Sequence, residues 1–294
     1  MVWLFFLSTV SAVSFLIFIA VLLSYNNLKQ IILQVDSPSE HPEHDVRDHF
    51  AAHKRLFRKG TLREEHYTKA HLDRLEAQYG RNKVIPDQIR AFVLVALSHY
   101  PQLADTHIVF QYKPIKQTMN ARPLISNLWT RRGQRGYTVI INNNQGPHKG
   151  LPLETLSFNI VTGILGHELA HLVAYQQMTN RQMILFALGY LLSDSFHRRV
   201  ERFTDYTTIV HGMAFPLYDG VEHILQDEGL TDEYKNKIQN NYLQLHEIEL
   251  FWLHANAEHV NAHLAQDTEI SETLHALSES SQNYEEASTE EETA

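Results

Sequence analysis

The chain carries the stretch GILGHELAHLV at residues 163–173, inside a segment, 154–178, whose pattern predicts one long helix. His167 and His171 would project from one face of that helix, because four residues make just over one turn, and both imidazoles could then bind one metal ion. Glu168 would lie about 100° round the helix from His167, where it could reach a water molecule without binding the metal itself. The apolar neighbours would bury both histidines, and a buried imidazole without a partner costs free energy. The stretch therefore predicts a zinc site, with a buried histidine pair that holds no metal as the alternative.

A zinc site on two histidines needs a third protein ligand, and the next predicted helix offers one. The long metzincin motif is excluded, because Ala174 and Gln177 stand where its glycine and third histidine would be. In the sequence ERFTD at residues 201–205, Glu201 and Asp205 share a helix face. Glu201 could bind zinc, and Asp205 could accept a hydrogen bond from the outer N–H of a ligand histidine. The alternatives are a solvated face paired with nearby arginines, and His197, one turn before Glu201, as the third ligand.

The pattern His167-Glu168-x-x-His171 followed by Glu201-x-x-x-Asp205 resembles that of the gluzincin class of zinc metallopeptidases. The resemblance extends over residues 167–205, and the N-terminal half of the chain carries no signature of the class. It implies one zinc ion per chain bound by His167, His171 and Glu201, general-base catalysis by Glu168, and support of a ligand histidine by Asp205.

The reaction implied by the resemblance is hydrolysis of a peptide bond in a peptide or protein substrate. Zinc would lower the pKa of a water molecule, Glu168 would take the proton of that water, and the carboxyl group would pass it to the leaving amine. A further hydrogen-bond donor should stabilise the oxyanion that forms. His211, Tyr206 and Tyr218 are candidate donors from the helical half, each with side-chain packing as its alternative role.

The segments around the motif predict an α+β, zincin-like fold that is mostly helical, with a small antiparallel sheet before the HExxH helix. Apolar residues predict a strand at His107–Tyr112 and a hairpin that pairs Ser126–Arg131 with Tyr137–Asn142. The resemblance implies that Tyr137–Asn142 is an edge strand able to pair with a substrate backbone. Helical spacing predicts further helices at 62–78, 86–99, 181–192, 194–215 and 232–264, the last of them as one helix or two.

The apolar run Met183–Leu192 lies between the two parts of the motif. It is too short to cross a bilayer, for which about 20 residues are needed. Its length favours a helix of the protein core, with contact to lipid as the alternative.

Residues Val2–Leu23 are almost wholly apolar and would span about 33 Å as a helix, enough to cross a hydrocarbon core of about 30 Å. We expect a single-pass membrane anchor at 1–24, with a cleaved signal peptide as the alternative. The basic residues that follow it lean towards a cytoplasmic catalytic domain. A linker at 25–60, a metallopeptidase domain at 61–265 and an acidic, disordered tail at 266–294 complete the expected organisation.

The composition limits the chemistry further. The chain contains 19 His and no Cys, which excludes disulfides and thiolate zinc sites. Its net charge of −9, from 25 Lys and Arg against 34 Asp and Glu, argues against nucleic acid as a partner, although Thr106–Leu153 is a basic block without acids. Two other functions remain open: a non-catalytic membrane-tethered protein with a structural zinc site, and a His-rich metal-buffering protein.

Overall fold

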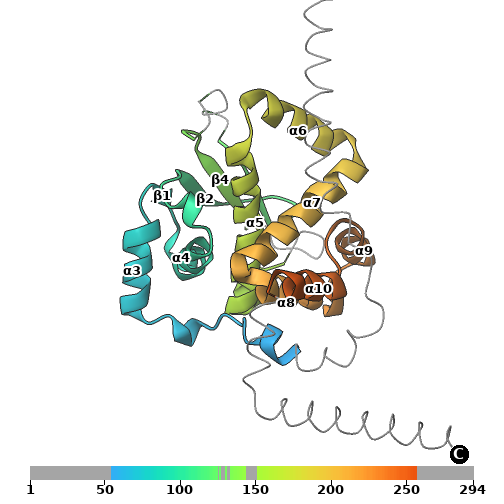
Figure 1. The fold of residues 1–294 in the computed structure, drawn as a ribbon, viewed down its shortest axis with the longest axis horizontal. Helices are drawn as coiled ribbons and strands as arrows, with labels where there is room; N and C mark the ends of the chain where they lie inside the picture. The colour runs from blue at the N-terminus through green and yellow to red at the C-terminus, as the bar shows by residue number, and fades with distance from the viewer. Residues whose placement is uncertain (1–53, 125, 127–129, 131–132, 144–150, 257–294) are drawn as a thin grey trace, which may run out of the picture.

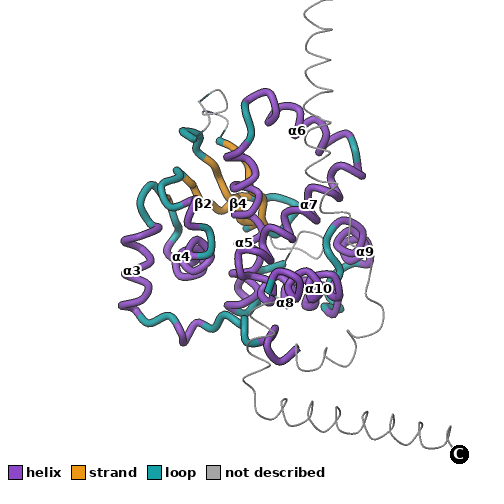
Figure 2. Tube along the Cα trace, in the orientation of Figure 1, coloured by secondary structure: helices purple, strands orange, loops and turns teal. Residues whose placement is uncertain are grey.

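The computed structural model describes residues 54–124, 126, 130, 133–143 and 151–256 (Figure 1). A small sheet and two helices lie on one side of a long central helix, α5 (Phe158–Gln177), and the C-terminal helices lie on the other side (Figures 1 and 2). The predicted anchor at 1–24, the tail at 266–294 and most of the linker at 25–60 fall outside the described residues. Within the described part, no helix is both long and apolar enough to cross a bilayer.

The sheet is mixed, in the order β1-β2-β4-β3. Strand β2 runs parallel to β1 and to β4, whereas β3 runs antiparallel to β4. The predicted antiparallel sheet is therefore wrong, but the strand predicted at 107–112 forms one residue later, at 108–113, and the strand predicted at 137–142 forms as expected. The strands are β1 (Lys83–Val84), β2 (Ile108–Lys113), β3 (Met119–Pro123) and β4 (Tyr137–Asn142).

The predicted hairpin partner of β4 is also wrong. Val139 of β4 lies opposite Phe110 of β2 on one side and opposite Ala121 of β3 on the other, so neither side of β4 is left for residues 126–131. All but the last residue of β4 are buried, as is typical of a strand covered on both faces. The sequence of β3, MNARP, is polar and contains a proline, which an edge strand tolerates, and this composition hid it from the apolar pattern.

Two helices accompany the sheet, α3 (Lys69–Tyr79) and α4 (Arg90–Ser98), each preceded by a short 3-10 turn. They overlap the helices predicted at 62–78 and 86–99 but begin later, at Lys69 and at Arg90. Thr68 begins α3, because its side chain accepts a hydrogen bond from the backbone N–H of His71. Residues 93–97 of α4 are all buried and join the sheet and α5 in the main hydrophobic core.

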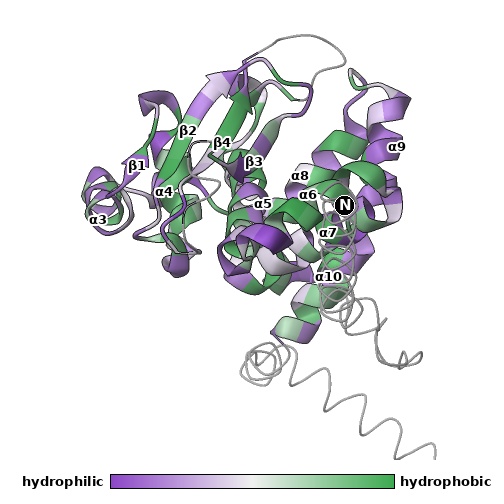
Figure 3. Cartoon of the chain, turned by 90° about the horizontal axis from the view of Figure 1, so that it is seen from above, coloured by the Kyte–Doolittle hydropathy of each residue, from purple (hydrophilic) through white to green (hydrophobic). Residues whose placement is uncertain are grey.

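The chain that follows α5 is helical through most of its described residues. The predicted helix at 194–215 is interrupted by a π-helical turn, Ile209–Met213, in which Gly212 has a φ of 80° that favours glycine. The segment from 232 forms two helices as far as it is described. Figure 3 shows hydrophobic colouring on β4 in the interior and hydrophilic colouring on α3 and α9 at the periphery. The helices are α6 (Asn180–Leu192), α7 (Asp194–Thr208), α8 (Ala214–Gln226), α9 (Asp232–Asn241) and α10 (Leu245–Ala255).

Helix α5 carries the GHELAH motif through the middle of the molecule (Figure 2). The side chain of Ser157 accepts a hydrogen bond from the N–H of Ile160 and so begins the helix. The helix contacts α4, β3, α7 and α8, and most of its residues are buried. Gly163 permits close packing on α8, because a Cβ there would lie 2.4 Å from the carbonyl oxygen of Pro216. The motif is thus held rigidly between the sheet and the C-terminal helices.

Candidate metal centre

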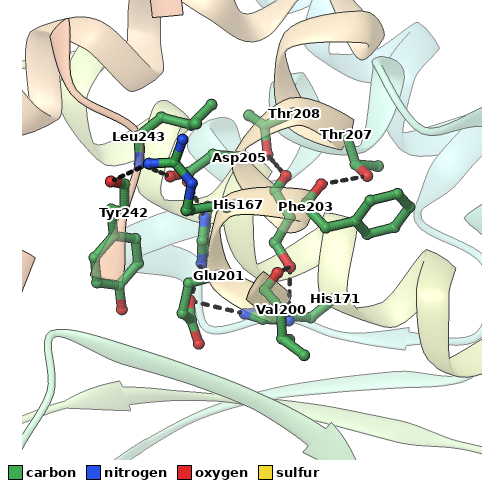
Figure 4. Close-up of polar contacts among 12 residues, drawn as sticks. His167, His171, Val200, Glu201, Phe203, Asp205, Thr207, Thr208, Tyr242 and Leu243 are labelled. Carbon is green, nitrogen blue, oxygen red and sulfur yellow. Dashed lines mark hydrogen bonds and ion pairs between the residues drawn. The ribbon is translucent and has the colours of Figure 1, made fainter. Parts of the chain in front are cut away.

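Helices α5 and α7 bring together three side chains that could bind a metal ion, and the one from α7 lies 30 or more residues after the two from α5 in the sequence. His167 and His171 project from α5, and Glu201 projects from α7 towards them (Figure 4). The three residues are 8%, 6% and 1% exposed, and one ligand atom from each lies within 4.8 Å of the others. Among the described residues, this is the group of three or more such side chains that could hold a metal ion.

The distances between the donor atoms suit a tetrahedral zinc site. Oε2 of Glu201 lies 3.1 Å from Nε2 of His167 and 3.6 Å from Nε2 of His171. Ligand atoms about 2.0–2.1 Å from a tetrahedral zinc ion lie about 3.3 Å from each other. The residues present therefore fit the metal that the motif predicts.

The outer nitrogen of His167 is held by Asp205. Nδ1 of His167 donates a hydrogen bond of 2.8 Å to Oδ1 of Asp205, which is fully buried. The other oxygen of Asp205 accepts a hydrogen bond of 2.9 Å from the backbone N–H of Leu243. Because the carboxylate can only accept, it keeps a proton on Nδ1 of His167, so Nε2 is the nitrogen that faces Glu201 and could bind a metal.

The outer nitrogen of His171 is held by a residue that the sequence pattern did not single out, Thr204. The hydroxyl of Thr204 donates to the carbonyl oxygen of Val200 at 2.9 Å, and its oxygen lies 3.2 Å from Nδ1 of His171. Since the hydroxyl proton is committed to Val200, the oxygen accepts from Nδ1–H of His171. Nε2 of His171 is thus the nitrogen that faces Glu201 and could bind a metal.

Glu201 has further contacts on the side away from the two histidines. The hydroxyl of Tyr190 donates a hydrogen bond to Oε1 of Glu201, and Nε2 of His197 lies 3.4 Å from the same oxygen. His197, the alternative third ligand, therefore contacts the outer oxygen of Glu201, whereas Oε2 lies nearest the two motif histidines.

Burial and charge shift the pKa values of these groups in opposite directions. Burial raises the pKa of Glu168, and the charges of His171 and His167 reduce that rise. Burial opposes ionisation of Glu201 too, but the charge of His171 and the hydrogen bonds from the histidines outweigh it and hold the Glu201 pKa well below its ordinary value. Burial lowers the pKa of His167, but hydrogen bonds to Asp205 and Glu201 outweigh it and raise that pKa well above its ordinary value. Two carboxyl groups on one site are thus tuned to different acidities.

A pocket opens beside these residues. It is bordered by β3 on one side, by the motif face of α5 on another, and by α8 and α9 beyond. His167, Glu168, His171 and Glu201 all line it, so the cluster is accessible from the pocket although its side chains are largely buried. The end of the pocket away from α6 is apolar and is formed by Ile164, Leu217, Val221, Ile224 and Ile238.

The strand that borders the pocket is β3, whereas the resemblance had implied β4. Strand β3 ends the sheet among the described residues, and β4 is interior. The backbone N–H of Leu124 donates to the carbonyl oxygen of Gly136 on the neighbouring strand, so these two residues form a hydrogen-bonded pair. Hydrogen-bonded and non-hydrogen-bonded pairs alternate along antiparallel strands. Met119 and Ala121 are an odd number of residues before Leu124, so their N–H and C=O groups point away from β4. The N–H of Ala121 donates to the carboxylate of Glu168. The free edge of β3 therefore runs directly past the predicted catalytic carboxylate.

The three oxyanion donors suggested by the sequence do not line this pocket. His211 donates from Nδ1 to the carbonyl oxygen of Thr207 and stacks on Tyr100. Tyr206 packs against Phe251. Tyr218 packs against Phe57 and Phe215.

Four other tyrosines line the pocket instead: Tyr175, Tyr190, Tyr234 and Tyr242. Tyr175 stacks on His171 with ring centroids 6.0 Å apart, and Tyr242 lies 5.6 Å from the ring of His167. Tyr190 and Tyr175 could have been noticed as hydroxyl groups on otherwise apolar helices near the motif. Tyr242 follows α9, far along the chain, and no local pattern connects it with the motif.

Comparison with known proteins finds no matching protein-family model, no similar curated protein and no similar solved structure. The functional argument therefore rests on the residues of the site.

Proposed function

We propose that the protein is a zinc-dependent metallopeptidase of the gluzincin type. The observation that carries the proposal is the convergence of Nε2 of His167, Nε2 of His171 and Oε2 of Glu201 beside an accessible pocket, with Glu168 on the same pocket wall. A bound zinc ion would activate a water molecule and polarise the carbonyl group of a peptide bond. Zinc binding also accounts for the buried imidazoles, whose outer nitrogens are bonded while their inner nitrogens face a carboxylate.

Glu168 is the proposed general base. Its carboxylate lines the pocket and is not part of the ligand group, which leaves it free to take a proton from water and to deliver that proton to the leaving amine. Burial raises its pKa, which brings the carboxyl group closer to the acidity that such a shuttle needs near neutral pH. The hydrogen bond from Ala121 holds the side chain against the edge of β3.

Tyr242 is the proposed donor to the oxyanion. Its side chain lines the pocket, and its hydroxyl makes no hydrogen bond to any of the described residues. Figure 4 shows this hydroxyl and the carboxylate of Glu201 pointing in a similar direction. Burial, followed by the charges of Glu201 and Asp205, raises its pKa well above the ordinary value, so the phenol keeps its proton and can donate it to a developing negative charge.

The free edge of β3 is the proposed binding site for the substrate backbone. The outward N–H and C=O of Met119 and the outward C=O of Ala121 would offer hydrogen bonds to an extended peptide, which would add to the sheet as a further strand. Such a peptide would lie between β3 and α5, with its backbone beside Glu168. The apolar end of the pocket would then take a large apolar side chain of the substrate next to the cleaved bond.

The expected anchor at Val2–Leu23 belongs to the same proposal, since it would hold the enzyme at a membrane. A structural zinc site is the second candidate function. The observation that favours it is His197, whose Nε2 lies 3.4 Å from Glu201 and which could complete a closed set of four ligands.

The test combines metal analysis with cleavage of a peptide library by the purified full chain. We expect one zinc ion per chain, loss of zinc in His167→Ala and Glu201→Ala, and cleavage that a chelator abolishes. Glu168→Gln should keep the zinc and lose the cleavage, which separates catalysis from folding. His197→Ala is the matched control, because it should leave both zinc content and cleavage in place.

Wild-type protein without zinc would contradict the proposal outright. Zinc that is lost in His197→Ala, together with absence of cleavage, would favour the structural site. Several zinc ions per chain would favour the metal-buffering protein.

A further inference from the structure

Helix α6 presents an unpartnered apolar surface. Ile184, Leu188, Leu191 and Leu192 are 40%, 49%, 78% and 81% exposed, and we call these four residues the apolar face of α6. They make up four of the seven large hydrophobic residues that are exposed in the described part of the chain. With about 100° between successive helical residues, they fall within an arc of about 100°, so they form one continuous stripe.

The opposite face of α6 is apolar as well and is already used. Met183 and Phe186 are buried in the main core, and Tyr190 reaches Glu201 from that side. A helix that is apolar on all sides is normally buried on all sides. The core helix predicted at 183–192 is therefore correct for one face only, and no described residue covers the other.

Charge at this surface suits an anionic partner. Arg181 is exposed and stands three residues before Ile184, seven before Leu188 and ten before Leu191, so it lies at the N-terminal end of the same stripe. No Asp or Glu occurs between Glu168 and Asp194. The surface therefore combines aliphatic side chains with one cationic side chain at its end and no acids, which suits contact with both the apolar and the anionic parts of a bilayer interface.

The expected N-terminal membrane segment would hold the protein close to a bilayer. Val2–Leu23 is the expected membrane segment, and residues 24–53, about 30 residues, could extend to about 100 Å before the described structure begins. The first described helical residues, 54–58, lie at the end of the molecule opposite α6 (Figure 1). A segment of that length is sufficient for α6 to rest on the membrane that holds the N-terminus.

We propose that the apolar face of α6 inserts into the headgroup region of the bilayer that holds the N-terminal segment, with Arg181 beside anionic lipid headgroups. The body of the protein then contacts the membrane at a second place, through the helix that joins the two parts of the metal centre. The proposal does not depend on peptidase activity.

Single-cysteine labelling of the full chain tests this contact, and the natural absence of Cys makes the labelling clean. Leu191→Cys, labelled with an environment-sensitive fluorophore, is reconstituted in vesicles of phosphatidylcholine and phosphatidylglycerol, with and without brominated lipid. We expect a blue shift of the emission and at least twofold quenching by brominated lipid. Val84→Cys on β1, a similarly exposed aliphatic position at 53%, is the control that should show neither effect.

Two further arms separate the possible occupants. Arg181→Glu in the Leu191→Cys background should reduce the quenching, as should vesicles of phosphatidylcholine alone. A blue shift without quenching by brominated lipid would show that protein, such as a second copy of the chain, covers the face, and would overturn the proposal. Emission at position 191 that matches position 84, or a full chain that fails to sediment with vesicles, would overturn it as well.

Discussion

The carboxylate of Asp205 lies 2.8 Å from Nδ1 of His167, and this contact turns the opposite nitrogen of the imidazole towards Glu201. The second oxygen of Asp205 is bonded to the backbone of Leu243, so the loop after α9 holds the carboxylate in place. Such an outer partner fixes both the orientation and the protonated nitrogen of a ligand histidine.

Removal of this partner should weaken metal binding. We expect Asp205→Ala to reduce the zinc affinity by about 10- to 100-fold, because the imidazole loses its orientation and the N–H of Leu243 loses its acceptor. Competition with a zinc chelator measures the affinity. Asp73→Ala, at an exposed position of α3, should leave it unchanged, and an equal loss in both variants would refute the assigned role.

Thr204 should matter to zinc binding although the motif does not contain it. Thr204→Val keeps the shape of the side chain but removes the acceptor for Nδ1 of His171, so we expect a loss of zinc affinity of about 10-fold or more. Thr207→Val is the matched control on the same helix, because the hydroxyl of Thr207 bonds, among the described residues, only to the carbonyl of Phe203. The comparison is made by chelator competition, with circular dichroism to verify folding; equal affinities in the two variants would contradict the role of Thr204.

Tyr242→Phe should lower kcat by about 10²-fold, the order seen when one oxyanion donor is removed, and should leave KM nearly unchanged. The reason is that the hydroxyl is expected to bond to the transition state rather than to the substrate. Tyr218→Phe, which alters a tyrosine packed against Phe57 outside the pocket, is the control and should retain wild-type kcat. Steady-state kinetics with a peptide found in the library separates the two parameters, and the reverse ranking of the two variants would refute the assignment.

The stability of metal-stripped protein should fall as the pH rises above about 6.5. The folded state raises the pKa of His167 above 6.5, so the stability from its protonated form is complete below 6.5 and is lost as the pH rises through the folded value. The folded state lowers the pKa of Glu201, so its contribution is present above 4.5 and is lost at acidic pH. Zinc binds deprotonated imidazole, so the increase in Tm that zinc causes should become larger as the pH rises above about 6.5.

Differential scanning calorimetry between pH 5.5 and 8, with chelator or with zinc, measures both effects. His167→Asn should show a weaker pH dependence without metal and little response to zinc. If the Tm of the metal-stripped wild type changed with pH in the same way as the Tm of His167→Asn, the assignment would be contradicted.

The motif residues could be predicted because their relationship is local. His167, Glu168 and His171 lie within just over one helical turn, and Glu201 and Asp205 lie within another, so helical geometry alone places each set on one face. The helices themselves were predictable for the same reason, apart from the interruption at Gly212.

The strand that borders the site could not be predicted in the same way. Strand β3 is polar, and its place at the edge of the sheet depends on β4 pairing with β2 across an intervening segment. The partners of the site come from equally distant places: Tyr242 and Leu243 follow α9, and Tyr190 belongs to α6.

The sequence by itself determined the group of two histidines and one glutamate that could hold a metal ion, the proposed general base and the predominance of helix, because each of these follows from spacing within a helical turn. Only the tertiary structure decided that β3 is the edge strand, that Tyr242 and Thr204 border the metal centre, and that one apolar face of α6 stays exposed. These features depend on which segments pack together, and packing between distant segments leaves no period in the local sequence from which it could be read.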